Sequence, residues 1–359
     1  PYVYRTVDYG KKWSRIVDGD DVKSYALSII QDKKSPNLLF LGTDDGLYLS
    51  IDNANSWIKW NKGFPTVPVK DLVIQEREND LVIGTFGRSA WVIDNINPLR
   101  ELAQNKALLN NKIKLFKPST AVHAAYQQPT GTRFGGDAMY NGENRKAGAL
   151  ISYYFNAKKD NDTLNKESKD SLYLNFYDGE KLIRTLKKKA PKESGFYRWT
   201  WRMDEKGKQR PSRTIRKKKF ESGGVSVKPG NYKIELSYSD KISNSSIDII
   251  NDPRIEQNPN SDDLYNSLKE LDELLQRSAD IVEQLVESKN TATTIKTRLN
   301  KLDKKKFKEN VDLSNTIVKE IDDLIALFLG GIDKRQGITR NLESNIQQEI
   351  YKAYSYISS

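Results

Sequence analysis

The sequence contains no cysteine and a single histidine, His123. Without cysteine the chain forms no disulfide, no thiolate metal site and no cysteine nucleophile, because each of these requires a sulfur atom. With one histidine it also lacks the histidine clusters that hold zinc in many proteins. We therefore predict no metal site and no cofactor, and base catalysis would have to depend on carboxylates or tyrosines.

Long hydrophobic runs are also absent. The sequence has no run of about 18 apolar residues, the length that a helix needs to cross a bilayer, and charged residues make up 30% of it. We therefore expect a soluble protein without a membrane span. The sequence starts at Pro1 without a methionine and reads as a strand almost at once, so we expect it to be part of a longer protein.

The net charge of +11 is concentrated in the middle of the sequence. Residues 1–100 hold 13 basic and 13 acidic residues, residues 101–250 hold 30 and 16, and residues 251–359 hold 16 and 19. The middle segment includes the basic runs Lys187–Lys189 and Arg213–Lys219. Such runs attract anionic surfaces, but no nucleic-acid-binding motif accompanies them, so we interpret them as solvated loop charge and do not expect a nucleic-acid partner.

The first hundred residues consist of short runs of β-branched and aromatic residues separated by turns. Gly, Asp and Asn occupy the turns, a pattern typical of an all-β unit. Seven runs have the length of a strand: Tyr2–Thr6, Ala26–Ile30, Leu38–Gly42, Gly46–Ser50, Leu72–Gln75, Leu81–Thr85 and Ala90–Asp94.

A short motif occurs twice in this part of the chain, and a period of about 40 to 50 residues is the size of one propeller blade. In a turn, Asp accepts hydrogen bonds from backbone N–H groups ahead of it, Gly adopts positive φ without a clash, and Trp supplies a large apolar face. The motif residues are Thr6, Asp8, Gly10 and Trp13 in the first copy and Ser50, Asp52 and Trp57 in the second.

Both copies resemble the Asp-box, S/T-x-D-x-G-x-T/S-W. The first copy departs from the pattern at Lys12, and the second has Ala54 where Gly is expected, which leaves its turn geometry open and indicates a degenerate copy. The resemblance implies that the boxes lie on outer hairpins of a β-propeller and stabilise its fold. We therefore interpret the seven motif residues as structural.

The segment from Asp80 to Asp94 resembles the closing blade of bacterial sortilin-like proteins, in which G-T-x-G-R-x-x-W-V-x-D recurs. These Asp-box, or neuraminidase-repeat, propellers are often labelled glycosyl hydrolases. The resemblance covers nearly the whole chain. Downstream it is carried by Leu115–Pro118, Gly142–Asn144, Gly148–Ile151, Lys228–Tyr232 and Asn251–Arg254.

We predict three parts. Residues 1–100 are the last blades of an incomplete β-propeller, residues 101–252 an immunoglobulin- or fibronectin-like β-sandwich, and residues 253–359 a helical hairpin or small bundle. Polar segments at Asn156–Lys169 and Asp204–Gly224 are predicted to be loops. The sandwich is predicted from strand-length runs at Gly148–Phe155, Ser171–Tyr177, Gly195–Trp201 and Asn231–Tyr238.

Apolar residues at helical spacing predict the helices of the last part. One stripe runs from Leu264 to Leu302, and Ser261 is expected to cap its start. A second stripe runs from Ile317 to Phe328 and stops at Gly330-Gly331, and a third helix is expected at about Leu342–Tyr356.

The family resemblance implies binding rather than catalysis. Sortilin-type propellers hold peptides or proteins in their channel, so a polypeptide is the expected ligand, with a glycan as an alternative. Arg88 and Trp91 are candidate channel residues; alternatively, Arg88 pairs with an acidic neighbour and Trp91 packs between blades. We interpret Asp44-Asp45 as an acidic turn rather than a calcium site, since no further oxygen ligands follow at short spacing.

Two blades do not close a ring, so we expect residues 1–100 to associate with the remaining blades, on the same or a separate polypeptide. The family implies an exported protein, in the periplasm or at the cell surface. The alternative function is a sialidase-like glycoside hydrolase whose catalytic carboxylates and arginines lie on blades upstream of Pro1, because this chain has no recognisable set of them.

Overall fold

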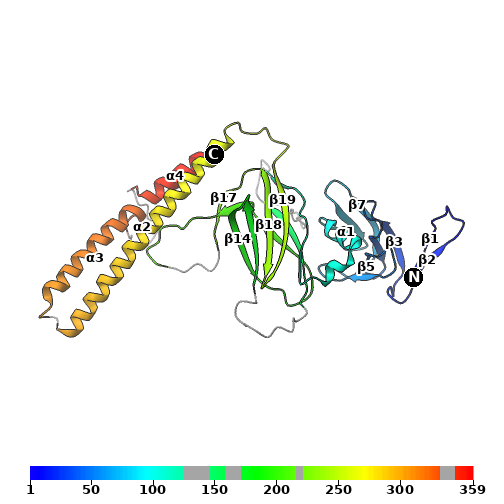
Figure 1. The fold of residues 1–359 in the computed structure, drawn as a ribbon, viewed down its shortest axis with the longest axis horizontal. Coiled ribbons are helices and arrows are strands. Elements are labelled where there is room, and N and C mark those ends of the chain that lie inside the picture. The colour runs from blue at the N-terminus through cyan, green and yellow to red at the C-terminus, as the bar shows by residue number, and fades with distance from the viewer. Residues whose placement is uncertain (125–145, 158–170, 216–220, 304, 332–343, 359) are drawn as a thin grey trace.

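The computed structural model describes residues 1–124, 146–157, 171–215, 221–303, 305–331 and 344–358. The motif at Gly142–Asn144 and most of the expected loop at Asn156–Lys169 lie outside these residues. The chain is mostly β-sheet, including a curled half-barrel sheet, and ends in a helical region. Figure 1 shows a β-unit at the N-terminal end, a second β-unit beside it, and a long helical arm beyond.

The first β-unit contains three antiparallel sheets whose strands pair in chain order, because antiparallel neighbours need only short turns between them. The seven runs expected from the sequence are confirmed as strands, and two further strands, at 14–17 and 58–60, were not expected. The three sheets are the hairpin β1 (Val3–Arg5) and β2 (Ser14–Val17), the four strands β3 (Ala26–Gln31), β4 (Leu39–Thr43), β5 (Gly46–Ser50) and β6 (Ile58–Trp60), and the three strands β7 (Val69–Gln75), β8 (Asp80–Thr85) and β9 (Ala90–Ile93).

Strands β4 and β5 are buried on both faces. Phe40 packs in a core shared with Leu81 of the β7–β9 sheet, whereas Leu41 packs in a second core with Trp57 and Val17. Because successive side chains of a strand point to opposite faces, a strand covered on both sides must be apolar at nearly every position. The four-stranded sheet therefore lies between the β7–β9 sheet and the β1–β2 hairpin.

A buried ion pair joins the two larger sheets to helix α1 (Asn97–Gln104). The Arg100 guanidinium donates from Nη2 and Nε to the Asp32 carboxylate at 2.6 and 3.0 Å, and the side chains are only 8% and 1% exposed. Arg100 Nη1 also donates to the side-chain oxygens of Asn79 and Asn97. The Ser35 N–H donates to Asp32, so the carboxylate also holds the turn that leads into β4.

Helix α1 and the short 3₁₀ helix η1 (Lys106–Asn110) lead from the first β-unit to the second. Phe116 belongs to the core of the first unit, yet its ring stacks on Phe196 of the second, with ring centres 5.8 Å apart. Two ion pairs also cross the junction, from Lys62 to Glu193 and from Arg198 to Asp94. The two β-units therefore share a packed boundary.

The second β-unit has two main sheets. One has the order β10-β12-β15 and the other the order β11-β19-β18-β13-β14, in which β11 and β19 run parallel. The strands are β10 (Ile113–Leu115), β11 (Ala121–His123), β12 (Ala149–Phe155), β13 (Ser171–Asp178), β14 (Lys181–Lys189), β15 (Gly195–Trp201), β18 (Gly230–Tyr238) and β19 (Lys241–Asn251).

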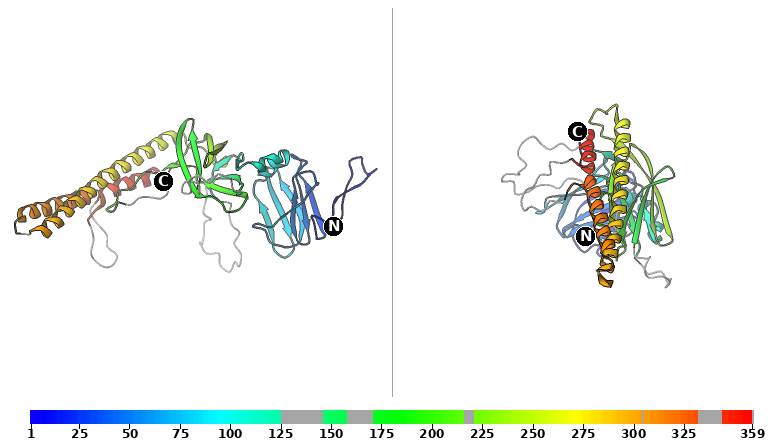
Figure 2. Two further views of the ribbon diagram at one scale, coloured as in Figure 1. Left: turned by 60° about the horizontal axis from the view of Figure 1, so that its bottom comes forward. Right: turned by 90° about the vertical axis from the view of Figure 1, so that its left-hand side faces the viewer.

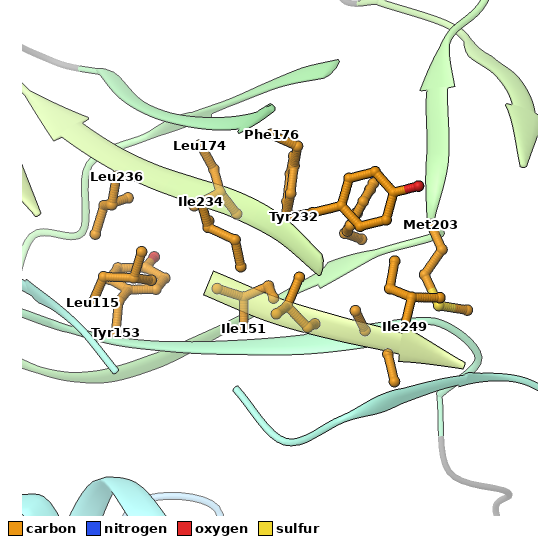
Figure 3. Close-up of a cluster of buried hydrophobic side chains, with 14 of the residues drawn as sticks. Leu115, Ile151, Tyr153, Leu174, Phe176, Met203, Tyr232, Ile234, Leu236 and Ile249 are labelled. Atoms are coloured by element: carbon orange, nitrogen blue, oxygen red, sulfur yellow. The ribbon is translucent and has the colours of Figure 1, made fainter. Parts of the chain in front are cut away.

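The two sheets share one hydrophobic core, and Figure 3 shows Ile151 and Tyr153 of one sheet near Leu174, Ile234 and Leu236 of the other. The alternating aromatic residues along β15 belong to this core. Trp201 is fully buried and stacks on Phe176 with ring centres 3.9 Å apart, and Tyr197 and Trp199 pack at the core's edge.

The expectation that Asp204–Gly224 is a loop throughout was wrong. Its ends form a small two-stranded sheet of β16 (Asp204–Lys206) and β17 (Gly223–Ser226). The segment 207–215, between these strands, contacts the helical region: the Gln209 N–H donates to Gln276 Oε1 at 2.8 Å, and Arg213 donates to the Gly330 carbonyl. A side chain of α2 and the carbonyl that follows α3 hold this polar segment, and local composition does not encode such contacts.

The helical region consists of α2 (Ser261–Leu302), α3 (Lys308–Leu329) and α4 (Ile346–Ser358). Val282 and Val286 of α2 pack against Ile321 and Ile325 of α3, and Figure 2 shows these two helices side by side along the arm. The stop at Gly330 is confirmed: it caps α3 with φ 76°. The cap at Ser261 was wrong, because Asn260 holds that position and makes no side-chain capping bond.

Among the described residues, no helix is both long enough and apolar enough to cross a membrane.

We predict that Arg100→Met destabilises the protein by about 3 kcal/mol, because it leaves the buried Asp32 carboxylate without its cation. Guanidinium denaturation followed by tryptophan fluorescence measures the loss. Lys33→Ala is the control, since it removes an exposed, solvent-screened ion pair with Glu76 that contributes little to stability. Equal effects of the two substitutions would contradict the importance of the buried pair.

Candidate functional site

The first motif forms the turn between β1 and β2. Thr6 Oγ1 donates to Asp8 Oδ1 at 2.9 Å and accepts from the Gly10 N–H at 2.8 Å. Asp8 Oδ1 also accepts from the Lys12 N–H at 2.8 Å. The bond from the Lys12 N–H, followed by the bond from Thr6, lowers the pKa of Asp8. The two side chains therefore bond to the backbone of their own turn.

The second motif forms the turn between β5 and β6 with the same bonds. Ser50 Oγ donates to Asp52 Oδ1 at 2.7 Å and accepts from the Ala54 N–H at 3.0 Å. Asp52 Oδ1 accepts from the Ser56 N–H at 2.9 Å. Burial raises the pKa of Asp52, but hydrogen bonds from Lys106, Ser56 and Ser50 outweigh it and hold that pKa far below its ordinary value.

The backbone of the two turns also matches. Tyr9 and Gly10 have φ of 58° and 90°, and Asn53 and Ala54 have φ of 59° and 68°. Ala54 therefore adopts the left-handed conformation that the motif assigns to glycine, although a Cβ atom makes that conformation unfavourable. The sequence difference at this position strains the turn without changing its shape.

The tryptophans of the two copies differ sharply in exposure. Trp57 is 7% exposed, and its indole N–H donates to the Ile16 carbonyl of β2 at 2.9 Å. Trp13 is 61% exposed, and its indole N–H donates to Gly10 within its own turn. The β1–β2 hairpin thus covers the second tryptophan, and among the described residues no equivalent hairpin covers the first.

The outer face of the β7–β9 sheet is a second uncovered surface. Val73 pairs with Val82 and Val82 with Val92, so three valines form one row across the three strands. Val73 and Val92 are 51% and 53% exposed. The next row holds Asp71, Gly84 and Ala90, so one carboxylate borders the valines and two small residues leave this part of the face flat. We call it the valine face.

At the opposite end of the same unit, β3 leaves Leu27 and Ile29 exposed. Ile29 pairs with Leu41 and shares its face of the sheet, which the β1–β2 hairpin covers only in part. The first β-unit therefore has apolar, incompletely covered surfaces at both ends of its row of sheets.

The two candidate channel residues lie at the turn between β8 and β9 but do not act together. Arg88 has an exposed side chain, and its carbonyl accepts from the Trp91 indole at 2.8 Å. The Trp91 ring turns inward and packs edge-on against Phe64, with ring centres 5.4 Å apart. Trp91 thus contributes to the core between the sheets of the first unit.

The other sequence candidates make structural contacts. Asp45 lies in the turn between β4 and β5. It accepts from Thr43 Oγ1 at 2.7 Å and pairs with Lys59 of β6 at 2.8 Å. Lys187 and Lys188 belong to the edge strand β14. Lys187 lies over the Tyr173 ring and Lys188 lies over the Trp199 ring. Across the described segments, no three Asp, Glu or His side chains are grouped as a metal site requires.

Two contacts of the motif turns were not foreseen from the sequence. Arg5 donates to Asn53 Oδ1 at 2.5 Å, joining the β1–β2 hairpin to the turn after β5. Lys106 of η1 pairs with Asp52 at 2.6 Å. Each contact joins residues about 50 positions apart, and local patterns contain no signal for such a pair.

The comparisons with known proteins identify no family. No family model matches the chain, and no curated protein matches it. Two solved structures of an extracellular domain from B. thetaiotaomicron, described as a hybrid two component system in one case and a one component system in the other, align with it at 12% identity and TM-scores of 0.19 and 0.18. Each alignment covers 68% of this chain and 27% of the solved chain, so this chain spans about a quarter of the length of the solved domain. TM-scores this low carry no argument about fold or function.

We predict that Gly10→Ala destabilises the first turn by about 1 to 2 kcal/mol, because Gly10 has positive φ. An added Cβ there has no neighbour within 4 Å, so the cost is conformational rather than steric. Gly19→Ala is the matched control: its Cβ also has open space, but its φ is not in the positive region. Thermal unfolding of both variants measures the difference, and equal shifts in Tm would argue against strain in the turn.

The pKa of His123 predicts how the free energy of unfolding depends on pH. Burial lowers its pKa below 6.5, by more than the bond from Nε2 to the Val227 carbonyl raises it. The unfolded chain therefore binds a proton more readily, and His123 contributes stability above pH 6.5 that is lost as the pH falls. His123→Gln should flatten the pH dependence of unfolding free energy below pH 6.5, measured by denaturation at pH 5.5 and 7.5. An unchanged slope would contradict the lowered pKa.

Proposed function

We propose that the first β-unit is the closing arc of a β-propeller and that the protein is a non-catalytic binding scaffold. The observation that carries this proposal is the difference between Trp57 and Trp13. A hairpin with the same turn chemistry covers one and not the other, so the repeat predicts a further blade over Trp13.

The strand order supports this assignment. The four strands β3–β6 pair in chain order, as a propeller blade does, and the motif turn joins the last two. By the same motif, β1 and β2 correspond to the last two strands of a preceding blade. The β7–β9 sheet corresponds to a blade without its fourth strand, because no described strand pairs with the outer edge of β9.

A closed ring of blades would explain why apolar surfaces are uncovered at both ends of the first β-unit. Neighbouring blades pack face to face, so every blade in a closed propeller covers two others. The valine face and the exposed residues of β3 are the faces that the next blades on either side would cover. A monomer rarely leaves such faces in water unless they are interaction sites.

The second β-unit fits an immunoglobulin-like sandwich. Its two sheets correspond to strands A-B-E and to G-F-C-C′, and the first strand of the fold divides into β10 and β11, one in each sheet. Such domains and helical hairpins are common spacers and binding modules. The whole chain therefore suits a scaffold in which the propeller binds a polypeptide or a glycan.

The proposed scaffold acts outside the cytoplasm, an assignment that depends on the sortilin-like resemblance alone. Glycoside hydrolysis is the alternative, and it requires catalytic carboxylates on blades other than those of residues 1–100. The described contacts of Asp8, Asp45 and Asp52 favour a structural role for the acidic residues of this arc.

The absence of native cysteine allows a direct test of the missing blades. Val92→Cys places one thiol on the valine face, and Leu182→Cys places a control thiol on the second β-unit, at positions 53% and 51% exposed. Maleimide labelling is measured by peptide mass spectrometry, in the isolated chain and in the protein as its native host assembles it. We expect the thiol of Val92→Cys to label at least tenfold more slowly in the native assembly, with labelling of Leu182→Cys unchanged.

Equal labelling of Val92→Cys in both preparations would refute the proposal, because the valine face would then be open in the assembled protein. Slower labelling of both variants would also count against it, since general shielding is not blade packing.

A further inference from the structure

A cavity of about 760 Å³ lies between the second β-unit and the helical region. Its walls come from β17 and the residues after it, from the first turns of α2, and from Tyr351 and Tyr354 of α4. Its size is within the range of pockets that bind small ligands or peptide segments. It is far along the chain from the motif turns and the valine face, so it is separate from the proposed propeller.

One wall of this cavity is a continuous length of backbone. Ser222 to Pro229, eight consecutive residues, all line it. Within this stretch, β17 pairs with β16 on one side, and in the described part of the chain no strand pairs with its other edge. Strand edges present alternating N–H and C=O groups, the pattern that an extended peptide satisfies by adding a strand.

The charges around the cavity favour an acidic occupant. Lys228 is neutralised by Asp262 at 2.6 Å. Lys208 and Arg210 also line the cavity and form no ion pair with any described residue, although Arg210 lies over the Tyr351 ring at 5.5 Å. These two cations lie in the segment that crosses from β16 toward the helices. An arriving carboxylate would therefore find unpaired partners.

The other carboxylate that lines the cavity, Asp272, already accepts a hydrogen bond within the protein. Asp272 is buried and accepts a hydrogen bond from the Tyr354 hydroxyl. Burial, followed by this bond, raises the pKa of Tyr354, so the hydroxyl keeps its proton and the pair stays intact at neutral pH. Asp272 thus ties α4 to α2 but keeps its negative charge, because a neutral hydroxyl donor does not cancel it. The three cations and two carboxylates among the described residues that line the cavity still leave one net positive charge to attract an anion.

Helix α2 contributes apolar side chains to the wall beside its two carboxylates. Leu264, Leu268 and Leu275 of α2 line it together with the ring of Tyr265. Side chains of an extended peptide alternate between two faces. A peptide paired with β17 could therefore direct apolar side chains toward α2 and acidic side chains toward Lys208 and Arg210.

We propose that this cavity binds an acidic peptide in extended conformation, which pairs with the open edge of β17. An acidic saccharide would also use the two cations, but it has no peptide backbone to pair with the four-residue edge of β17. The backbone wall therefore favours the peptide.

The test titrates the chain of residues 1–359 with acetyl-Val-Glu-Val-Asp-Val-amide by isothermal titration calorimetry. We expect binding, and we expect Lys208→Ala/Arg210→Ala to weaken it by about tenfold or more, since each cation supplies a charge-assisted hydrogen bond. The matched control is Lys187→Ala/Lys189→Ala, which removes the same charge from β14, away from the cavity. This control should change the affinity less than twofold.

Two N-methylated forms of the peptide test strand pairing. One carries methyl groups on the odd-numbered amides and the other on the even-numbered amides, so each blocks the donors of one edge. We expect one form to lose binding and the other to keep it. Amide shifts of Gly223 to Val225 should change in NMR spectra with the unmodified peptide.

Four outcomes would overturn the proposal. These are no binding of the acidic peptide at millimolar concentration, equal binding of acetyl-Val-Lys-Val-Lys-Val-amide, an equal effect of both N-methylated forms, and tighter binding of a galacturonic acid pentamer. None of these results depends on whether the first β-unit belongs to a propeller.

Discussion

The buried ion pair between Asp32 and Arg100 organises the first half of the molecule. Asp32 follows β3 and fixes the turn into β4, while Arg100 lies on α1 and also bonds Asn79 in the turn between β7 and β8. One guanidinium thus connects both larger sheets and the helix that leaves them. A planar guanidinium suits this position, because it has enough donors in fixed directions to satisfy three side chains at once.

The effect of this pair extends beyond the first β-unit. Helix α1 packs into the core between the sheets and directs the chain to Phe116, whose ring stacks on Phe196 of the second unit. The second unit in turn holds the start of α2, where Tyr265 and Lys269 both donate to Glu205. The described units therefore form a chain of packed contacts, from the sheets of the N-terminal half to the helical arm.

Much of the secondary structure was predictable from periodicity, and the failures have physical reasons. The two-residue alternation in β13, β15 and β18 and the apolar stripes of α2 and α3 follow from burial on one face. Strands β14 and β19 were missed because lysine in the first, and serine and asparagine in the second, dilute the apolar pattern. These strands are held by backbone pairing with β13 and β18, which does not depend on side-chain type.

The candidate site was predictable only where its bonds are local. The motif turns close within about eight residues, so their chemistry could be read directly from the sequence. For Trp91 the sequence left two interpretations open, a channel residue or a packing residue, because its partner Phe64 lies on a different connection. Pairs distant in sequence, such as Lys106 with Asp52, depend on the complete topology.

The two copies of the motif show that the structure of the turn is independent of whether its tryptophan is buried. Both turns keep the same hydrogen bonds and the same positive φ values, even where Ala54 replaces glycine, so the local structure does not require the tryptophan to be covered. Burial of Trp57 comes instead from the neighbouring hairpin. A large aromatic side chain gains much of its stabilising effect from burial, of the order of 25 cal/mol per Å² of apolar surface removed from water. Trp13 would gain that free energy only through contact with a further structural unit, which is the physical reason for regarding the exposed ends of this arc as interfaces.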